Sequence, residues 1–394
     1  MPKLNSRPLS IASRLWIAVG RISPPCANQL TFEGPGTFDP DAWRAAVLAA
    51  ATANPGTRLV LRGSLGSSRW VDSGTAPRVR EADASGWDGM GSDGAPFLME
   101  SFDPRNGPNA EVLLMHGNPA RVSFRSHHAV MDGRGAATWA EDVFRALRGE
   151  EPAGSEYTMT ENDLLNFVPG SAARPLPHHN LAPTGAADGS DVSPVWRRKT
   201  IRGKVDSLLP KVILCAARAA RRHADGPVRI GVPVDLRRRC EGLRSTGNLT
   251  NAIYIDIPGE AGCEDIAGMI TERLERRSDG EITWEDSIIR YVPVRLLGRA
   301  IAAEGARNRR SGGYRCSGFV SNLGRLEIGR FACNDFSPTT YYGVPVCAPI
   351  VPFSMTLSGT AAGIELLLAM PRCMSTGGRI GAALDAIERE LMTP

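Results

Sequence analysis

The sequence lacks several features that would place it in a specialised class of protein. No apolar run approaches the roughly 18 residues that a transmembrane helix needs. The N-terminal apolar patch LWIAVG is shorter than a secretory signal core. We therefore expect a cytoplasmic protein without a membrane span. A net charge of +4 over 394 residues is small, which argues against a dedicated nucleic-acid binder.

Cysteine and histidine are scattered. The eight cysteines include no CxxC pair, so the sequence predicts neither a zinc site nor a disulfide framework. We expect most of them to be small apolar residues in a reduced compartment. Four of the six histidines form two adjacent pairs, at positions 127–128 and 178–179, and we expect the second pair, in a Pro-rich loop, to be solvated. The pair at 127–128 is the first candidate for chemistry.

Hydrophobic periodicity predicts alternating helices and strands. Residues 38–56 predict a helix, with Asp39 as its N-cap and Pro40 in its first turn. Residues 110–126 predict a β-hairpin that turns at 117–119 and is followed by a helix ending near Gly149. Further helices are predicted at 205–223, 264–277 and 375–392, and further strands at 57–63, 228–236, 248–258, 318–324 and 363–371.

A segment rich in Pro, Gly and Ser divides the chain. It shows no sustained period and resembles a linker or a long loop. We predict an N-terminal lobe over 1–170, a linker over 171–194 and a C-terminal lobe over 195–394. Strands and helices mix in both halves, which predicts an α/β protein with two lobes.

The stretch SHHAVMDGRG, residues 126–135, combines a base with a carboxylate. Histidine is the side chain best suited to take a proton near neutral pH. A buried Asp132 would need a cationic partner, and that ion pair would hold the loop so that one histidine projects rigidly. Gly133 would permit a backbone conformation closed to other residues, and its N–H could stabilise an oxyanion.

Three interpretations of the two histidines stay open on the residues alone. One ring could be a general base, both could belong to a structural cluster, or both could ligate a metal. Neighbouring side chains on a strand point apart, so His127 and His128 would not readily share one ion. No third ligand motif is evident either, and we expect no metal site.

Residues 127–133, with a predicted strand before them and a helix after, resemble the HHxxxDG signature of the chloramphenicol acetyltransferase-like superfamily. That superfamily includes the condensation domains of nonribosomal peptide synthetases. The segments RIGVPVDLRRR, TGNLTNAIYIDI and GFVSNLGRL are similar to later parts of its members. The resemblance extends from about residue 8 to residue 391. It implies an α/β fold whose two lobes form a V with a tunnel at their interface.

The resemblance also implies an acyltransferase. A thioester donor, acyl-CoA or an acyl carrier protein, would react with a hydroxyl or amine of a small acceptor in specialised metabolism, with no tightly bound cofactor. His128 would be the general base and Gly133 the oxyanion donor. Asp132 would form a structural ion pair with Arg237, for which Arg238 and Arg325 are rival partners.

The resemblance places three further residues beside the substrate. Ser321 and Asn322 would line the tunnel. His127 belongs to the same substrate-binding set, although a structural role is the stronger expectation for it.

Two alternatives accompany this interpretation. The chain could be a free-standing condensation enzyme that joins substrates bound to carrier proteins, or a non-catalytic module that recruits a partner enzyme. In either case we expect a monomer that binds no nucleic acid.

Overall fold

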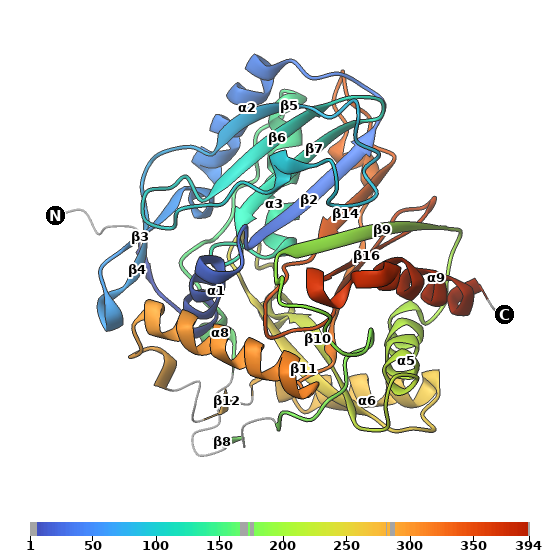
Figure 1. The fold of residues 1–394 in the computed structure, drawn as a ribbon. Helices are drawn as coiled ribbons and strands as arrows, with labels where there is room; N and C mark the ends of the chain where they lie inside the picture. The colour runs from blue at the N-terminus through green and yellow to red at the C-terminus, as the bar shows by residue number, and fades with distance from the viewer. Residues whose placement is uncertain (1–5, 166–171, 174–176, 281, 284–287, 393–394) are drawn as a thin grey trace.

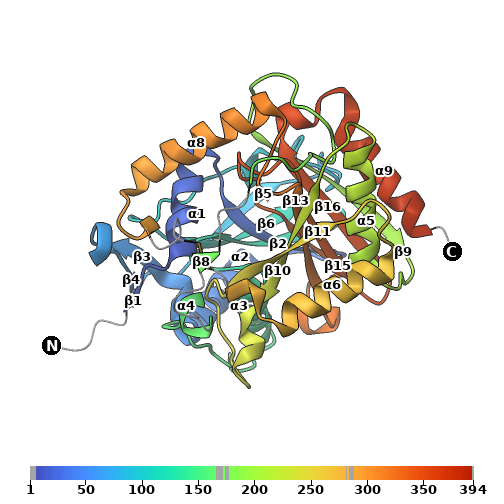
Figure 2. The same cartoon turned by 90° about the horizontal axis from the view of Figure 1, so that it is seen from below.

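The computed structural model describes residues 6–165, 172–173, 177–280, 282–283 and 288–392. Two large β-sheets, each covered by helices, build two lobes that meet along the middle of the molecule (Figures 1 and 2). The α/β architecture predicted from the sequence is confirmed. The linker predicted over 171–194 lies partly outside the described residues, at 171 and 174–176.

The first lobe is built on a five-stranded sheet in the order β14-β2-β7-β6-β5. All neighbours are antiparallel except β5 and β6. Helices α2 and α3 pack against each other and against this sheet. The bounds are β2 Ala27–Gly34, β5 Arg78–Asp83, β6 Ala110–His116, β7 Ala120–His127, β14 Thr340–Val344, α2 Pro40–Ala53 and α3 Gly133–Leu147.

The second lobe is built on a six-stranded sheet in the order β11-β10-β13-β15-β16-β9. Strand β13 runs parallel to both neighbours, and the other pairs are antiparallel. Helices α5, α6 and α9 cover it. The bounds are β9 Pro194–Arg202, β10 Val228–Asp235, β11 Thr250–Ile257, β13 Gly318–Arg325, β15 Ser354–Gly359, β16 Gly363–Pro371, α5 Leu208–Arg221, α6 Cys263–Glu275 and α9 Arg379–Met392.

Smaller elements complete the chain. Strands β1, β4 and β3 form a small sheet beside the first lobe, and β12 pairs with β8. Within the described residues, no helix is long and apolar enough to cross a bilayer. The bounds are β1 Ser6–Pro8, β3 Leu59–Arg62, β4 Arg69–Asp72, β8 Ala172–Ala173, β12 Ile282–Thr283, α1 Ile11–Ile22, α4 Glu161–Leu164 and α8 Val294–Ser311.

The elements that depend on local signals were predicted well. Helix α2 begins after Asp39, whose carboxylate accepts from the N–H groups of Asp41 and Ala42, and Pro40 occupies its first turn. The predicted hairpin is β6–β7. Helix α3 buries Trp139 and Phe144 in the core of the first lobe.

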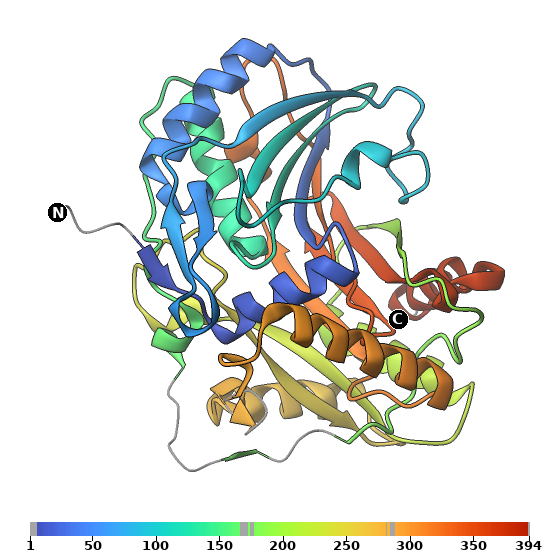
Figure 3. The same cartoon turned by 60° about the vertical axis from the view of Figure 1, so that its left-hand side comes forward.

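Two long-range contacts cross between the halves of the sequence. Strand β14 comes from the predicted second lobe but pairs with β2 of the first. Helix α1 lies against α8, and both run across the front of the molecule between the sheets (Figure 3). The predicted lobe boundaries stay a prediction, but strand exchange of this kind was not part of it.

A buried charge network joins the two sheets. Arg198 of β9 contacts Glu33 of β2 at 3.0 Å and Glu365 of β16 at 2.8 Å. Arg121 of β7 contacts the same Glu33 at 2.6 Å. Burial opposes ionisation of Glu33, but the two guanidinium groups outweigh it and hold the pKa of Glu33 below its usual value. The network therefore ties the two lobes together away from water.

Candidate active site

The HHxxxDG residues form a tight loop between β7 and α3. The His128 N–H donates to the Cys26 carbonyl at 3.1 Å, and the Val130 N–H donates to the His127 carbonyl at 2.9 Å. The three residues between the histidines and Asp132 are fully buried in the hydrophobic core of the first lobe. The loop is thus anchored by its apolar centre, with the functional groups at its two ends.

Asp132 is held by five hydrogen bonds. Its carboxylate caps α3 by accepting from the Gly135 N–H at 2.7 Å. It also accepts from the Leu249 N–H at 2.7 Å, from the Thr250 hydroxyl at 2.9 Å, and from both terminal nitrogens of Arg237 at 3.0 Å each. Arg237, the partner predicted for it, therefore lies against Asp132 in a two-pronged ion pair.

The ion pair is buried and fixes the charge on Asp132, which is only 3% exposed. Burial alone would raise the pKa of Asp132. The charge of Arg237 and the hydrogen bonds outweigh burial, so that the pKa lies below the usual value. Arg237 is itself fixed by the carbonyls of Ser245 at 3.0 Å and Gly247 at 2.6 Å. Because Arg237 follows β10, the pair clamps the loop of the first lobe to the second.

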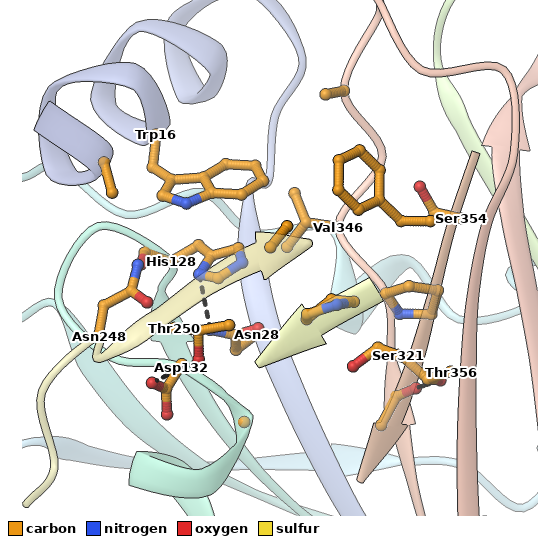
Figure 4. Close-up of a pocket in the computed structure, with 18 of the residues that line it drawn as sticks. Trp16, Asn28, His128, Asp132, Asn248, Thr250, Ser321, Val346, Ser354 and Thr356 are labelled. Carbon is orange, nitrogen blue, oxygen red and sulfur yellow. Dashed lines mark hydrogen bonds between the residues drawn. The ribbon is translucent and has the colours of Figure 1, made fainter. Parts of the chain in front are cut away.

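The His128 ring is held by neutral groups. The indole of Trp16 stacks on the imidazole, with the ring centroids 4.0 Å apart and the planes 17° apart. The side-chain nitrogen of Asn28 lies 3.1 Å from Nδ1 of His128, and the Asn248 amide donates to the His128 carbonyl at 2.8 Å. Figure 4 shows Trp16 above the ring and Asn28 at its edge. Trp16 and Asn28 therefore contact the ring, and Asn248 fixes the backbone that carries it.

Burial lowers the pKa of His128 to about 4, although hydrogen bonds to the carbonyls of His128 and Met131 and the charge of Asp132 oppose it. The imidazole is therefore neutral at neutral pH and has a lone pair available. For Nε2 to accept a proton, the hydrogen of the neutral ring must be on Nδ1. The group of Asn28 that faces Nδ1 is its amide nitrogen, a donor that also bonds the Met131 carbonyl and favours the opposite tautomer. The base form therefore requires the Nδ1 hydrogen to be bound by an acceptor, and the carbonyls of His128 and Met131 are the ones that bond the ring.

His127 has a different environment. It is 2% exposed, and its Nδ1 accepts from the Ala129 N–H at 3.0 Å. Burial and the neighbouring His128 lower its pKa to about 3. The side chain lies against Gly20, where a Cβ would come within 2.9 Å of Nε2. His127 is not part of the cavity wall, so its position does not support the substrate contact expected for it. His127 is the last residue of β7 and His128 the first residue of the turn, so their side chains leave the backbone in different environments.

A cavity of about 860 Å³ opens at His128 between the two lobes. Gly133, Ser321 and Asn322 line it, as the resemblance implied. Ser321 lies across the cavity from His128 (Figure 4). Towards α1 and α8 the wall is mostly apolar and includes Leu15, Val19, Leu297, Ile301, Val346 and Ile350. The cavity thus combines the imidazole of His128 with a long apolar side.

Gly133 is present for a reason other than the predicted one. Its backbone is helical, because it is the first residue of α3, and its φ is not in the left-handed region. A Cβ at this position would lie 3.2 Å from Cδ2 of Leu323 across the cavity. The glycine is therefore explained by space. The first N–H groups of a helix have no carbonyl of the preceding turn to bond, and the N–H of Gly133 is one of them.

Trp16, Asn28 and Asn248 are the site residues that the sequence analysis missed. Trp16 belongs to the patch LWIAVG, which was tested only as a signal sequence. The patch also fits a helix, with Ile17, Ala18 and Val19 buried in α1. The two asparagines carry no local signature. In the described part of the chain, no cluster of His, Cys, Asp or Glu is placed to hold a metal ion.

No family model matches the sequence, and no curated protein sequence matches it either. Solved structures do. The first condensation domain of the calcium-dependent antibiotic (CDA) synthetase superposes with a TM-score of 0.67 at 14% identity, covering 98% of this chain and 95% of that one. The starter condensation domain of rhizomide synthetase, a mutant in complex with C8-CoA, gives 0.64 at 17% identity and covers 98% and 93%.

The epimerization domain from the third module of tyrocidine synthetase B has the same fold, with a TM-score of 0.60 at 14% identity over 98% of this chain and 95% of that chain. The chain therefore has the two-lobed fold of condensation and epimerization domains. At these identities the likeness establishes the fold and leaves the reaction to the site.

Proposed function

We propose that the protein is an acyltransferase that moves an acyl group from a thioester to a hydroxyl or amine of a small acceptor, with His128 as general base. The observation that carries the proposal is a neutral imidazole facing an 860 Å³ cavity between two lobes. Its loop is fixed by the buried pair of Asp132 and Arg237. Neutrality, access and rigid placement are what a base requires.

The reaction would proceed in two steps. Nε2 of His128 takes the proton of the acceptor hydroxyl or amine while the acceptor oxygen or nitrogen bonds to the thioester carbon. The carbonyl oxygen becomes an oxyanion, for which the Gly133 N–H at the start of α3 is the first candidate donor and Ser321 the second. Collapse re-forms the carbonyl and breaks the C–S bond, and His128 returns the proton to the departing sulfur.

The donor would be a co-substrate that is not held between turnovers, either acyl-CoA or an acyl group on the phosphopantetheine of a carrier protein. The apolar wall between α1 and α8 suits the hydrocarbon part of an acyl group or acceptor, because burying each methylene is worth about 0.8 kcal/mol. A free-standing condensation enzyme acting between two carrier proteins would use the same base.

The test is thiol release from octanoyl-CoA and from octanoyl N-acetylcysteamine thioester, with water, simple alcohols and amines as acceptors and mass detection of the products. We expect His128→Ala to lower kcat/KM by about 10²–10⁴-fold. His116→Ala is the matched control, because His116 lies at the surface, with its side chain 42% exposed. Turnover in His128→Ala equal to the wild type would contradict the proposal.

The epimerization domain among the similar structures calls for a second measurement. An epimerase would use a base to remove the Cα proton of an aminoacyl thioester without releasing thiol. Incubating an aminoacyl N-acetylcysteamine thioester in D₂O separates the two reactions. Deuterium at Cα with no thiol release would replace acyl transfer by epimerisation, whereas thiol release supports transfer.

A further inference from the structure

Two arginines stand at one end of the cavity. Arg134 follows Gly133 in the first turn of α3, and Arg238 follows Arg237 in the short turn after β10. Both line the cavity and both are exposed. Arg237 and Arg134 approach the same carboxylate, Asp235, at 2.9 Å and 3.7 Å. Arg238 lies three residues after Asp235 and also lines the cavity, so both exposed arginines belong to the part of the wall around this carboxylate, called here the mouth.

The three consecutive arginines after β10 have separate tasks. Arg237 forms the buried pair with Asp132. Arg239 contacts the buried carboxylate of Asp279 at 2.6 Å and 2.7 Å. Arg238 alone points to the cavity mouth, and among the described residues it has no hydrogen-bond or ion-pair partner. The ion pairs of Arg237 and Arg239 stabilise the fold, whereas Arg238 makes no such pair in the part of the chain that the structure describes.

Arg134 is also poorly explained by stability. A cation in the first turn of a helix opposes the helix dipole, whose positive end lies there. Within the described part of the chain, its only ion-pair contact is the 3.7 Å approach to Asp235, with 45% of its side chain exposed. An exposed pair at that distance contributes little. An anion at the mouth would interact favourably with both the arginine and the helix end.

The charges at this mouth favour an anion. Arg134, Arg237 and Arg238 stand against the two carboxylates of Asp132 and Asp235, so that one positive charge is in excess at the mouth. Towards α8 the cavity wall carries Glu304 and Arg315, which pair with each other at 2.8 Å. That side has no comparable excess of positive charge. The two sides of the cavity therefore differ in the ligand groups they suit.

We propose that Arg134 and Arg238 bind the phosphate of the phosphopantetheine arm that carries the donor thioester. This inference rests on the proposed acyl transfer and names the mouth through which the donor reaches His128. Phosphate is the group that matches an exposed guanidinium pair beside a helix N-terminus. The arm would then pass Gly133 and Asn322 into the cavity.

The test compares binding of pantetheine, 4′-phosphopantetheine and CoA to the full chain by calorimetry. We expect Arg238→Ala to weaken phosphopantetheine binding about three- to tenfold, with pantetheine binding unchanged. The double variant Arg134→Ala/Arg238→Ala should weaken it further, and added salt should reduce the difference. Arg202→Ala is the control, since Arg202 is exposed at the end of β9 and outside the cavity wall.

Equal phosphopantetheine binding by wild type and the double variant would overturn the proposal, as would an equal loss for pantetheine. Tighter binding of CoA than of phosphopantetheine supports CoA as the donor, and equal binding shows that the nucleotide part of CoA adds no affinity. Either result is consistent with a phosphate site at Arg238 if Arg238→Ala binds phosphopantetheine more weakly than the wild type does. Thiol release from the phosphate-free octanoyl N-acetylcysteamine thioester separates the two proposals, because it depends on His128 and not on Arg238.

Discussion

The two ends of the HHxxxDG loop are held in different ways. Asp132 also borders the cavity, but its two carboxylate oxygens are occupied by five hydrogen bonds, two of them from Arg237. His128 has a stacked indole on one face, an amide at one edge and a cavity at its side. An anchor works best when all its lone pairs are occupied, whereas a base needs one left free. The loop thus separates rigidity from reactivity over five residues.

The largest expected effect follows from breaking the anchor. Arg237→Ala leaves the Asp132 charge buried without its cation, so we expect the free energy of unfolding to fall by about 3–5 kcal/mol. His128→Ala should change it far less, because the ring makes only neutral contacts. Urea unfolding of both variants measures the contrast. An equal loss in the two would remove the distinction between the ends of the loop.

A control for this variant is Arg244→Ala. Arg244 pairs at 2.8 Å with Asp142, which is fully buried in α3, and neither residue lines the cavity. We expect a loss of stability with kcat/KM of the folded protein unchanged, because the site is untouched. Arg237→Ala should lower both quantities.

The pH dependence of kcat/KM tests whether His128 is neutral at the pH of catalysis. A base whose pKa is lowered to about 4 is deprotonated above that pH and active there, and activity is lost as the pH falls through 4. The pKa of Asp132 lies below its usual value, so that its carboxylate stays ionised over the same range. The acid limb of kcat/KM should therefore lie near 4. A limb near 6.5, the ordinary histidine value, would show a solvated ring.

The variant Asn28→Asp tests which group controls the pKa of His128. A carboxylate 3.1 Å from Nδ1 would stabilise the protonated ring and the Nδ1–H form. We expect the acid limb to move up by about 1–3 pH units. Asn28→Leu, which has similar size and no charge, should leave the limb near its original position. If Asn28→Asp also leaves it there, Asn28 does not contact the ring during catalysis.

The smallest effect is expected at Trp16. Stacked aromatic rings contribute about 0.5–1.5 kcal/mol beyond buried area, so Trp16→Leu should lower kcat about two- to tenfold by loosening the His128 ring. Trp16→Phe keeps a flat ring and should retain most of the rate. Identical rates for the two variants would show that the indole fills space without orienting the imidazole.

Much of the first lobe could be predicted because its signals are local. The cap at Asp39, the hairpin turn at 117–119 and the helical period after Gly135 each depend on neighbouring residues. Arg237 was found as the partner of Asp132 through resemblance, and its position 105 residues away gave no other clue. The pairing of β14 with β2 could not be predicted, because its registers join residues about 300 positions apart.

The sequence by itself determined the alternation of strands and helices and the base and carboxylate of one loop, because hydrophobic period and short motifs act within a few residues. Tertiary structure alone decided that His128 meets a cavity while His127 does not, that Trp16 and Asn28 orient the ring, and that Arg238 faces the mouth. These depend on which surfaces of the two lobes pack together. Burial, which sets the charge on His128, exists only after that packing.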